Sequence, residues 1–323
     1  MKTKVVFIIL YFGKIPDYFE LWAESACRNL EFDFLIFSDL SFDVKRYPNI
    51  NTVFISFDEV QKIIKEKIDI PVKCAEPYKL CDYKAAYGYI FAEYIKDYEF
   101  WGFCDVDLIF GKISNYINDE LLSKYDKILF QGHFSLQRNT EKINKIFMKK
   151  YDNVLDYEYS FSTDLICHFD ENGTLAYCNE YENDITFYFG WIFFDTEINK
   201  YKITEWKSDE EVCFLWDNGV LVEYSKNGTK SQEYMYVHLQ KRKMKKCFEG
   251  MSEQFIIMRD EFIEYNGDIS YYFNIPIDNE KEKSFYHNYK KSSIRNKIDR
   301  IKKGWVKYKI NSKIQKWRSQ KVR

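Results

Sequence analysis

Three short apolar segments near the start of the chain constrain its fold more than any other feature. They are Val5–Tyr11, Phe32–Phe37 and Thr52–Phe57, all rich in β-branched and aromatic residues. The first is apolar throughout, which is typical of a parallel strand covered on both faces. Between the first two, Pro16–Asn29 places apolar residues on one face of a predicted helix. The order strand, helix, strand, strand predicts a Rossmann-like α/β half.

The rest of the chain continues this mixed pattern. Helices are predicted around Glu59–Lys67, Tyr78–Tyr94 and Glu141–Lys150, and strands at Phe100–Val106, Ile128–Phe130 and Tyr234–Leu239. The pattern predicts short strands and turns over Phe161–Thr204, and a closing hairpin from Phe255–Tyr265 and Ser270–Ile277. We therefore expect an α/β protein with a mixed sheet flanked by helices, as one domain over residues 1–285 and a tail over 286–323.

The composition excludes several classes of protein. With 46% hydrophobic and 30% charged residues, the 323-residue chain can bury a large core and is not disordered. Its eight cysteines form no Cys-x-x-Cys pair, which favours reduced thiols over disulfides or a zinc site. No apolar run reaches the ~18 residues that span a bilayer, and the apolar start lacks a signal-peptide cleavage site. We expect a cytoplasmic protein.

Charge is unevenly distributed along the chain. From Asn288 to Arg323 there are 14 Lys and Arg and one acid, Asp299, a net charge of +13, so residues 1–287 carry −15 of the total of −2. Apolar residues recur in this tail at Ile294, Ile298, Ile301, Trp305, Tyr308, Ile310, Ile314 and Trp317. We expect a basic amphipathic helix that lies on an anionic membrane surface through residues 290–323. A helix packed on the domain, or a coil that binds a protein, stays open. The acidic body excludes nucleic acid as its ligand.

The carboxyl end of the predicted strand Phe100–Val106 carries the strongest chemical signal. Asp105 and Asp107 stand one residue apart between apolar neighbours, an arrangement that is costly unless a cation is bound. In an open α/β sheet, ligands bind at the carboxyl ends of the strands, where both residues should lie. Hard oxygen ligands on such a turn suit Mg²⁺ or Mn²⁺, which bridge phosphate oxygens. The alternative is a solvated turn with two acids.

A second signal lies far downstream. His238, at the end of a predicted strand, is followed by Lys241, Arg242 and Lys243. Such a histidine can supply a third metal ligand, and the cations can neutralise a diphosphate. Taken alone, the histidine would be a structural residue and the cations a solvated face. Beside the acidic pair they indicate a metal–diphosphate complex, and hence a nucleotide-linked substrate.

Seven motifs follow one another in a characteristic order. They are Ile8–Pro16, Phe34–Asp39, Pro77–Lys84, Phe100–Leu108, Gly132–Leu136, Phe169–Glu171 and His238–Met244. As a set they resemble a bacterial family of glycosyltransferase-like proteins with the GT-A fold, found in capsule and exopolysaccharide gene clusters. The resemblance spans about residues 5–250. It implies a catalytic domain with a donor half over about residues 1–130 and an acceptor half over about 131–285, which transfers a sugar from a nucleotide-sugar, a UDP-sugar being favoured.

The resemblance also implies roles for individual residues. Asp105 and Asp107 match the metal-binding Asp-x-Asp motif and His238 the late metal ligand, for Mn²⁺ or Mg²⁺. Donor contacts are expected from Tyr11, Phe12, Gly13, Asp39, Lys79, Asp82, Lys84, Asp105, Val106, Lys241 and Lys243. The implied acceptor is a growing, lipid-linked cell-surface saccharide at the inner face of the plasma membrane.

The expected chemistry follows from charge. The metal and nearby cations would stabilise the leaving nucleoside diphosphate. An inverting enzyme would also need a carboxylate to deprotonate the acceptor hydroxyl, and Asp170 and Glu171 are the candidates, with His133 as a further acceptor-side group. The Asn-Gly pair that follows them equally predicts a polar hairpin turn.

Two other functions stay open. A nucleotidyl- or phosphotransferase could use the same sheet, acidic pair and metal. A glycine-rich phosphate loop near the first strand would favour this class, but Gly13 is the only glycine before Gly88. A non-catalytic carbohydrate-binding protein at the membrane is the third possibility.

Overall fold

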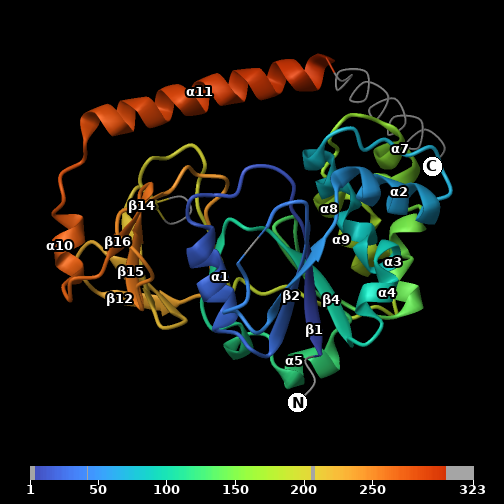
Figure 1. The fold of residues 1–323 in the computed structure, drawn as a ribbon, viewed down its shortest axis with the longest axis horizontal. Helices are drawn as coiled ribbons and strands as arrows, with labels where there is room; N and C mark the ends of the chain where they lie inside the picture. Colours follow the sequence, from blue (N-terminus) through green and yellow to red (C-terminus); the bar gives the residue numbers. More distant parts are fainter. Residues whose placement is uncertain (1–3, 42, 205–207, 303–323) are drawn as a thin grey trace.

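The computed structural model describes residues 4–41, 43–204 and 208–302, and its central element is a seven-stranded mixed sheet (Figure 1). In spatial order the strands are β3 (Ile50–Phe54), β2 (Phe32–Ser38), β1 (Val5–Leu10), β4 (Phe100–Cys104), β7 (Phe134–Arg138), β6 (Lys127–Gln131) and β8 (Phe187–Tyr188). The first four strands are parallel, whereas β7 is antiparallel to both β4 and β6. Because β1 and β4 are parallel neighbours, the residues that follow them meet at one edge of the sheet.

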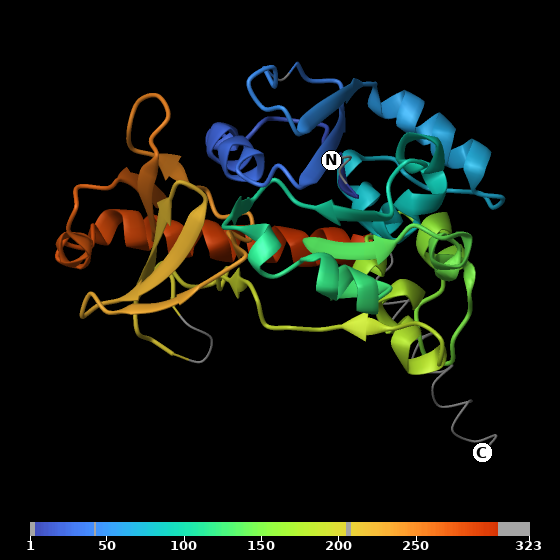
Figure 2. The same cartoon turned by 90° about the horizontal axis from the view of Figure 1, so that it is seen from below.

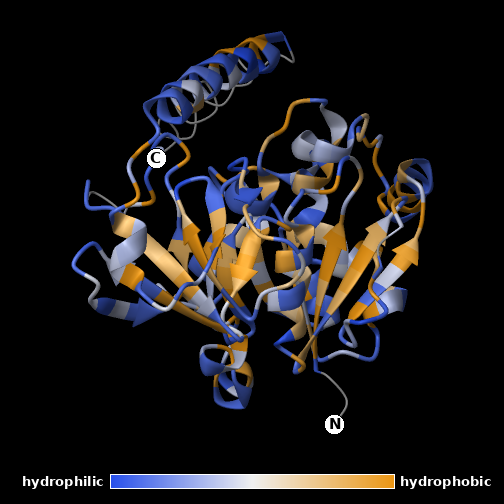
Figure 3. Ribbon diagram, turned by 60° about the vertical axis from the view of Figure 1, so that its left-hand side comes forward, coloured by the Kyte–Doolittle hydropathy of each residue, from blue (hydrophilic) through white to orange (hydrophobic). Residues whose placement is uncertain are grey.

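Alternate residues of β1 face two separate hydrophobic cores, as the period of a strand requires. Phe7 and Ile9 pack with Trp22 of α1 (Phe19–Cys27) on one face of the sheet. Val6 and Ile8 contribute to a second core on the other face. That core is covered by α2 (Phe57–Lys67), η1 (Pro77–Ala86), α3 (Tyr87–Ile90), α4 (Ala92–Ile95), α6 (Glu141–Asn144), η3 (Ile146–Met148), α7 (Tyr157–Ser162), α8 (Phe169–Asn172) and α9 (Thr174–Tyr181). The central strands are accordingly hydrophobic along their length (Figure 3).

Two smaller sheets complete the described fold. A three-stranded sheet has the order β5 (Leu108–Phe110), β13 (Tyr236–His238) and β9 (Phe194–Asp195). A six-stranded sheet has the order β12 (Lys230–Glu233), β11 (Val220–Ser225), β10 (Val212–Asp217), β15 (Gln254–Met258), β16 (Glu261–Glu264) and β14 (Lys245–Lys246). Figure 2 shows the six-stranded sheet beside the central sheet, at one end of the molecule. The three-stranded sheet joins residues from the middle and the last third of the chain.

The remaining helices lie at the edges of the molecule. η2 (Ile113–Asn115) and α5 (Asp119–Lys124) connect β5 to β6, and α10 (Ile269–Phe273) follows β16. The long helix α11 (Asn279–Lys302) crosses the molecule from the six-stranded sheet towards α7 and α8 (Figures 1 and 2). Among the described residues, no helix combines the length and the apolar character that crossing a bilayer requires.

The structure confirms the α/β class and most of the elements predicted over the first 150 residues, with shifted ends. The third strand is Ile50–Phe54, so Phe57 begins α2 instead of ending the strand. Ser56 explains this boundary, because its hydroxyl accepts a hydrogen bond from the Glu59 amide while the Glu59 carboxylate accepts one from the Ser56 amide. The stretch over residues 78–94 is helical but begins as the 3₁₀ helix η1.

Two predictions for the second half of the chain are wrong. The region from Phe161 to Thr204 was expected to be short strands and turns, which holds only for residues 182–204 with β8 and β9; α7, α8 and α9 lie within residues 157–181. Its aromatic and apolar residues are buried in the second core at helical spacing. The closing hairpin is β15 with β16 alone, since Asp268 caps α10 by accepting a hydrogen bond from the Ser270 amide. The tail is helical from Asn279 to Lys302; its continuation through Trp305, Tyr308, Ile310, Ile314 and Trp317 lies outside the described residues.

Candidate active site

A cleft of about 960 Å³ opens at the carboxyl ends of β1 and β4. Its walls come from the segments after these strands, from the β6–β7 turn, from α8 and from the segment after β13. Of the residues predicted from the sequence, those that line it are Tyr11, Lys84, Asp105, Val106, Asp107, His133, Asp170, Glu171, His238, Lys241 and Lys243. The strand order of the central sheet thus brings together residues that lie up to 232 positions apart, from Tyr11 to Lys243.

Asp105 and Asp107 lie on the turn between β4 and β5. The Asp105 amide donates to the carbonyl oxygen of His133 (3.0 Å), which ties this turn to the start of β7. The side chain of Asp107 is buried, and its Oδ2 accepts a hydrogen bond from the Lys241 amide (2.7 Å). Its Oδ1 is also buried but accepts no hydrogen bond from any described residue. A buried carboxylate oxygen without a donor is costly, so this atom marks a position for a ligand.

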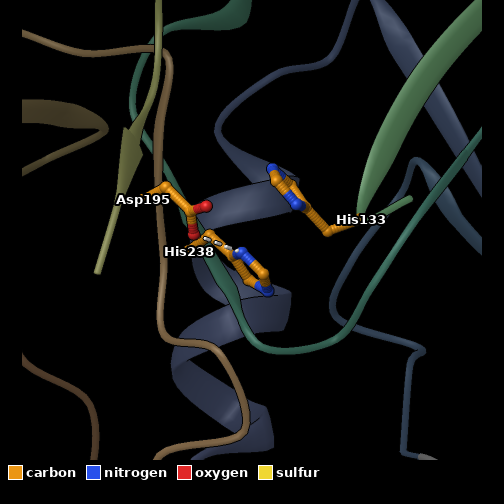
Figure 4. A group of neighbouring side chains, drawn as sticks. All are labelled: His133, Asp195 and His238. Carbon is orange, nitrogen blue, oxygen red and sulfur yellow. Dashed lines mark hydrogen bonds and ion pairs between the residues drawn. The ribbon is translucent and has the colours of Figure 1, made fainter. Parts of the chain in front are cut away.

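His238 faces Asp107 because of the register between two strands. In the antiparallel pair of β13 and β5, His238 is opposite Leu108, the residue after Asp107. His238 Nε2 lies 3.6 Å from Asp107 Oδ1, which is too far for a hydrogen bond. On the other side of the ring, Nδ1 lies 2.8 Å from Asp195 Oδ1 at the end of β9 (Figure 4). Asp195 thereby holds the ring with Nε2 directed at the acidic pair.

The carboxylates on both sides of His238 control its charge. Burial alone would lower the pKa of His238, but Asp107 and Asp195 outweigh that effect and raise the pKa to about 10. Burial likewise opposes ionisation of Asp107, yet His238 and the Lys241 amide hold the pKa of Asp107 below its usual range. In the absence of another cation, therefore, a protonated imidazole neutralises the buried carboxylate.

His133 packs against the ring of His238. The two imidazole rings are stacked, with centroids 3.9 Å apart and planes inclined by 27° (Figure 4). His133 Nε2 lies 3.0 Å from the hydroxyl of Tyr236. Burial and the neighbouring charge of His238 hold the pKa of His133 well below its ordinary value, so His133 is neutral. Its position favours packing against His238 over the acceptor-side role predicted from the sequence.

The residues around Asp107 fit a divalent cation. Asp105, Asp107 and His238 each offer a ligand atom, and these atoms lie within 4.8 Å of one another. Two carboxylates and one imidazole are a donor set suited to Mn²⁺ or Mg²⁺. The unpartnered Asp107 Oδ1 and the His238 Nε2 that faces it are the two atoms such an ion would satisfy. His133, Asp195 and His238 also lie close enough together to hold an ion. However, the hydrogen bond between His238 and Asp195 and the stacked rings favour the Asp105–Asp107–His238 set.

A second charged group lies deeper in the cleft. Lys84 Nζ contacts Asp105 Oδ1 (2.5 Å) and the Gly132 carbonyl oxygen (2.6 Å), and it lies 4.0 Å from Asp170 Oδ2. Burial would lower the pKa of Lys84, but Asp105 and Asp170 together raise it, so Lys84 is a permanent cation. Burial raises the pKa of Asp170 to about 8 despite the opposing charge of Lys84. Asp170 Oδ1 is buried and accepts no hydrogen bond from the described residues.

The segment after β13 supplies further cations through an unusual backbone. Gln240 and Lys241 both have positive φ angles, 48° and 59°, in the left-handed region that few side chains adopt. This turn directs the Lys241 amide at Asp107 and its side chain at Tyr78, whose hydroxyl lies 2.5 Å from Nζ. Lys243 follows at the rim of the cleft. Lys84 and Lys241 therefore border the acidic pair, and Lys243 lines the same cleft.

Several residues predicted to contact a donor lie elsewhere. Lys79 and Asp82 are 1% and 0% exposed and form a buried ion pair with Nζ and Oδ2 2.6 Å apart. Lys79 also donates to the carbonyls of residues 160 and 165, and Asp82 accepts from the amides of residues 167 and 169. Their role as donor contacts is therefore corrected: they hold the segment that carries Asp170. Phe12, Gly13 and Asp39 were also predicted to contact the donor, but none of the three lines the cleft. Phe12 packs on Phe57, Gly13 has open space around its Cα atom, and Asp39 is exposed just after β2.

The hairpin interpretation of the segment after Phe169 is also wrong. Asp170 and Glu171 belong to α8, and the Glu171 carboxylate accepts a hydrogen bond from the Gly132 amide (3.2 Å). Gly132 lies close to both carboxylates. A Cβ atom there would lie 2.6 Å from Glu171 Oε1 and 2.7 Å from Asp170 Oδ2. A larger residue at position 132 would therefore require both carboxylates to shift.

A comparison with known families places most of the chain. Residues 7–266 match the model of DUF6625, described as a family of unknown function. The chain belongs to DUF6625. No curated protein matches it. Every cleft residue named above lies inside the DUF6625 region, whereas α11 lies wholly outside it.

Within this DUF6625 region, sequence reasoning missed three residues of the site. Asp195 orients His238, Tyr236 contacts His133, and Tyr78 contacts Lys241. Asp195 had a detectable signal, because it ends the apolar run Trp191–Phe194 just as Asp105 ends the apolar strand β4. The two tyrosines had none that separates them from the other 25 in the chain.

Proposed function

We propose that this protein is a metal-dependent glycosyltransferase with a GT-A-like catalytic domain. In this proposal it moves a sugar from a nucleotide-sugar, with UDP-sugars favoured, to a growing, lipid-linked cell-surface saccharide. The observation that carries the proposal is the group Asp105, Asp107 and His238 at the carboxyl end of β4, with ligand atoms within 4.8 Å of one another. Its position at the edge where β1 and β4 end is where open α/β sheets bind nucleotides.

The surroundings of this group suit a diphosphate. Lys84, Lys241 and Lys243 line the same cleft and can contact phosphate oxygens. Tyr11, which follows β1 and lines the cleft, offers an aromatic surface for a nucleotide base. A volume of about 960 Å³ is at the upper end of the range for small-molecule sites and accommodates a nucleotide-sugar.

The residues divide the chemistry among them. Asp105, Asp107 and His238 would hold the cation, which when bound stabilises negative charge on the departing diphosphate. Lys84 stays charged because Asp105 and Asp170 surround it, and so adds fixed positive charge beside the acidic pair. Such fixed charges cost no reorganisation as the anomeric C–O bond breaks.

Asp170 is the group in the cleft best suited to move a proton. With a pKa of about 8, its ionised fraction near neutral pH can accept a proton, and this fraction grows as the pH rises. Its buried Oδ1 has no described hydrogen-bond partner. We therefore assign Asp170 to deprotonation of the acceptor hydroxyl and Glu171 to holding the Gly132 turn.

Thermal-shift measurements test the proposal directly. The purified protein is screened against UDP-, GDP-, CDP- and dTDP-sugars with and without Mn²⁺, because ligand binding to the folded state raises the melting temperature. We expect a shift with one nucleotide that requires the metal and disappears in Asp107→Ala. Asp152→Ala, which removes an exposed aspartate outside the cleft, should respond as the wild type does. The absence of any shift with all four nucleotides would refute the nucleotide-sugar assignment.

A further inference from the structure

Helix α11 packs against the rest of the protein beside the cleft at its start, and its end lies within electrostatic reach of a second cleft residue. At its start, the Phe285 ring packs edge-on against Tyr201 (centroids 5.6 Å apart) and lies 5.2 Å from the guanidinium carbon of Arg242, a cleft residue. Towards its end lies Arg300. Burial lowers the pKa of His168, another cleft residue, and the positive charge of Arg300 adds to this effect. The start and the end of the helix thus lie beside two different cleft-lining residues, and Figure 1 shows the helix running from the six-stranded sheet towards α7 and α8.

The opposite face of α11 is apolar and uncovered. Ile294, Ile298 and Ile301 are 50%, 47% and 56% exposed. At 3.6 residues per turn they fall within an arc of about 60°. Phe285, which contacts the body, lies about 180° from Ile294 on the same helix. The isoleucines thus point away from the protein.

Cations border this apolar stripe on both sides. Lys290 and Lys297 flank it on one side, and Lys291, Arg295 and Lys302 on the other, by the same helical geometry. Residues 288–302 contain six Lys and Arg and the single acid Asp299. Long basic side chains beside a narrow apolar stripe can bury their methylene stems while their charges stay in a layer of anionic headgroups.

This charge pattern selects among possible partners. A second copy of the helix would bring two strongly positive faces together, so like charges oppose a dimer through this face. The stripe is three isoleucines long, which is too small for a stable protein interface by itself. An anionic bilayer satisfies both features, because it accepts shallow apolar side chains and attracts each nearby cation.

We propose that the outward face of α11 docks on an anionic lipid surface and presents the mouth of the cleft to that surface. The second part rests on the proposed function, since a cleft that faces lipid suits a lipid-linked acceptor. Because α11 passes cleft-lining residues near both of its ends, the acceptor would approach from the membrane side, between the helix and the cleft.

Vesicle cosedimentation of the full chain, without nucleotide or metal, tests the docking. We expect binding to vesicles of phosphatidylcholine with phosphatidylglycerol, little binding to phosphatidylcholine alone, and weaker binding as salt rises. A triple variant Lys290→Gln/Lys291→Gln/Lys297→Gln should bind about 100-fold more weakly, at roughly fivefold for each charge. The matched control Lys4→Gln/Lys112→Gln/Lys124→Gln removes three exposed lysines at or near the opposite end of the molecule, around α5, and should bind like the wild type.

A pair of single variants on α11 tests which face binds. Ile298→Glu places a carboxylate in the stripe, whereas Asn296→Glu places the same charge on the side facing away from it. We expect Ile298→Glu to weaken binding at least about tenfold and Asn296→Glu no more than about threefold. Melting temperatures of all variants verify that they are folded.

Three outcomes would overturn the proposal. They are no binding of the wild type to anionic vesicles, equal losses in the two glutamate variants, and a dimer in solution that Ile298→Glu dissociates, which would make a second copy the partner. The assay contains neither donor nor metal, so its failure leaves the glycosyltransferase proposal intact. Conversely, the absence of nucleotide binding would leave the docking result unaffected.

Discussion

Replacement of Asp195 by alanine tests whether this residue orients the imidazole of His238. Asp195 Oδ1 lies 2.8 Å from His238 Nδ1 and accepts a hydrogen bond from the side-chain Nε2 of Gln240 at 2.6 Å. Without the carboxylate, neither the orientation of the ring nor the protonation of Nδ1 is fixed. The position of β9 itself should persist, because Thr196 donates to the His238 carbonyl oxygen through both its amide (3.1 Å) and its hydroxyl (2.9 Å).

The size of the effect follows from the exposure of the carboxylate. Loss of such an outer partner of a metal ligand typically weakens metal binding 10- to 100-fold. The Asp195 side chain is 33% exposed, so water replaces part of the lost interaction. We therefore expect the lower end of the range, about tenfold in the dissociation constant for Mn²⁺, or ~1.4 kcal/mol. Asp195→Asn keeps an oxygen acceptor and should lose only about threefold.

Isothermal titration with Mn²⁺ at fixed pH measures the effect. Asp126→Ala serves as the control, since Asp126 also forms a partly exposed ion pair, with Arg138, but lies outside the cleft. Equal Mn²⁺ affinity in Asp195→Ala and the wild type would refute the reasoning. So would a loss in Asp126→Ala of the same size, because the effect would then reflect general destabilisation.

Three further predictions concern stability and the shape of the cleft. Burial lowers the pKa of Lys127 to about 8, so between pH 8 and about 10 the unfolded state binds more protons and the free energy of unfolding rises with pH. Lys127→Met should remove this rise in urea unfolding. At pH 7 the variant should gain about 1–2 kcal/mol in the free energy of unfolding, because removing the buried charge saves ~3 kcal/mol and loses the hydrogen bond to the Leu175 carbonyl oxygen. Asp82→Ala leaves Lys79 charged and buried and should lower the free energy of unfolding by about 3–5 kcal/mol in the same assay; a change below 1 kcal/mol would contradict a structural role. Gly132→Ala should abolish nucleotide-sugar binding in the thermal-shift assay, because its Cβ displaces both Asp170 and Glu171, and unchanged binding would show that these carboxylates do not shape the donor site.

The sequence predicted the central sheet because its strands are distinctive. β1, β2 and β4 are apolar on both faces, and turn residues separate them from the helices. The acidic pair and His238 could be associated because each lies at the carboxyl end of a predicted strand. Their actual proximity depends on the register between β5 and β13, which joins residues 130 positions apart and leaves no local pattern.

Other features could not be read from the sequence for physical reasons. The aromatic residues of α7, α8 and α9 are poor helix formers, and tertiary burial of Phe161 and Phe169 decides their conformation. Lys79 and Asp82 resembled ligand-binding charges because a sequence does not show that two charges neutralise each other inside a core. Asp195 carried a weaker signal than the acidic pair, because it is a single acid at the end of a strand of only two residues.

The three-stranded sheet β5–β13–β9 has a consequence for how the site comes into being. Asp107 precedes β5, Asp195 ends β9 and His238 ends β13, so the three residues come from widely separated parts of the chain. Contacts of such large sequence separation form late in folding, because the intervening chain must first be ordered. A nascent chain that ends before β13 would therefore present two exposed carboxylates and no third ligand. Cation affinity would then be gained only at the step that completes the junction between the central sheet and the six-stranded sheet. Binding of the ion would therefore stabilise that junction against unfolding.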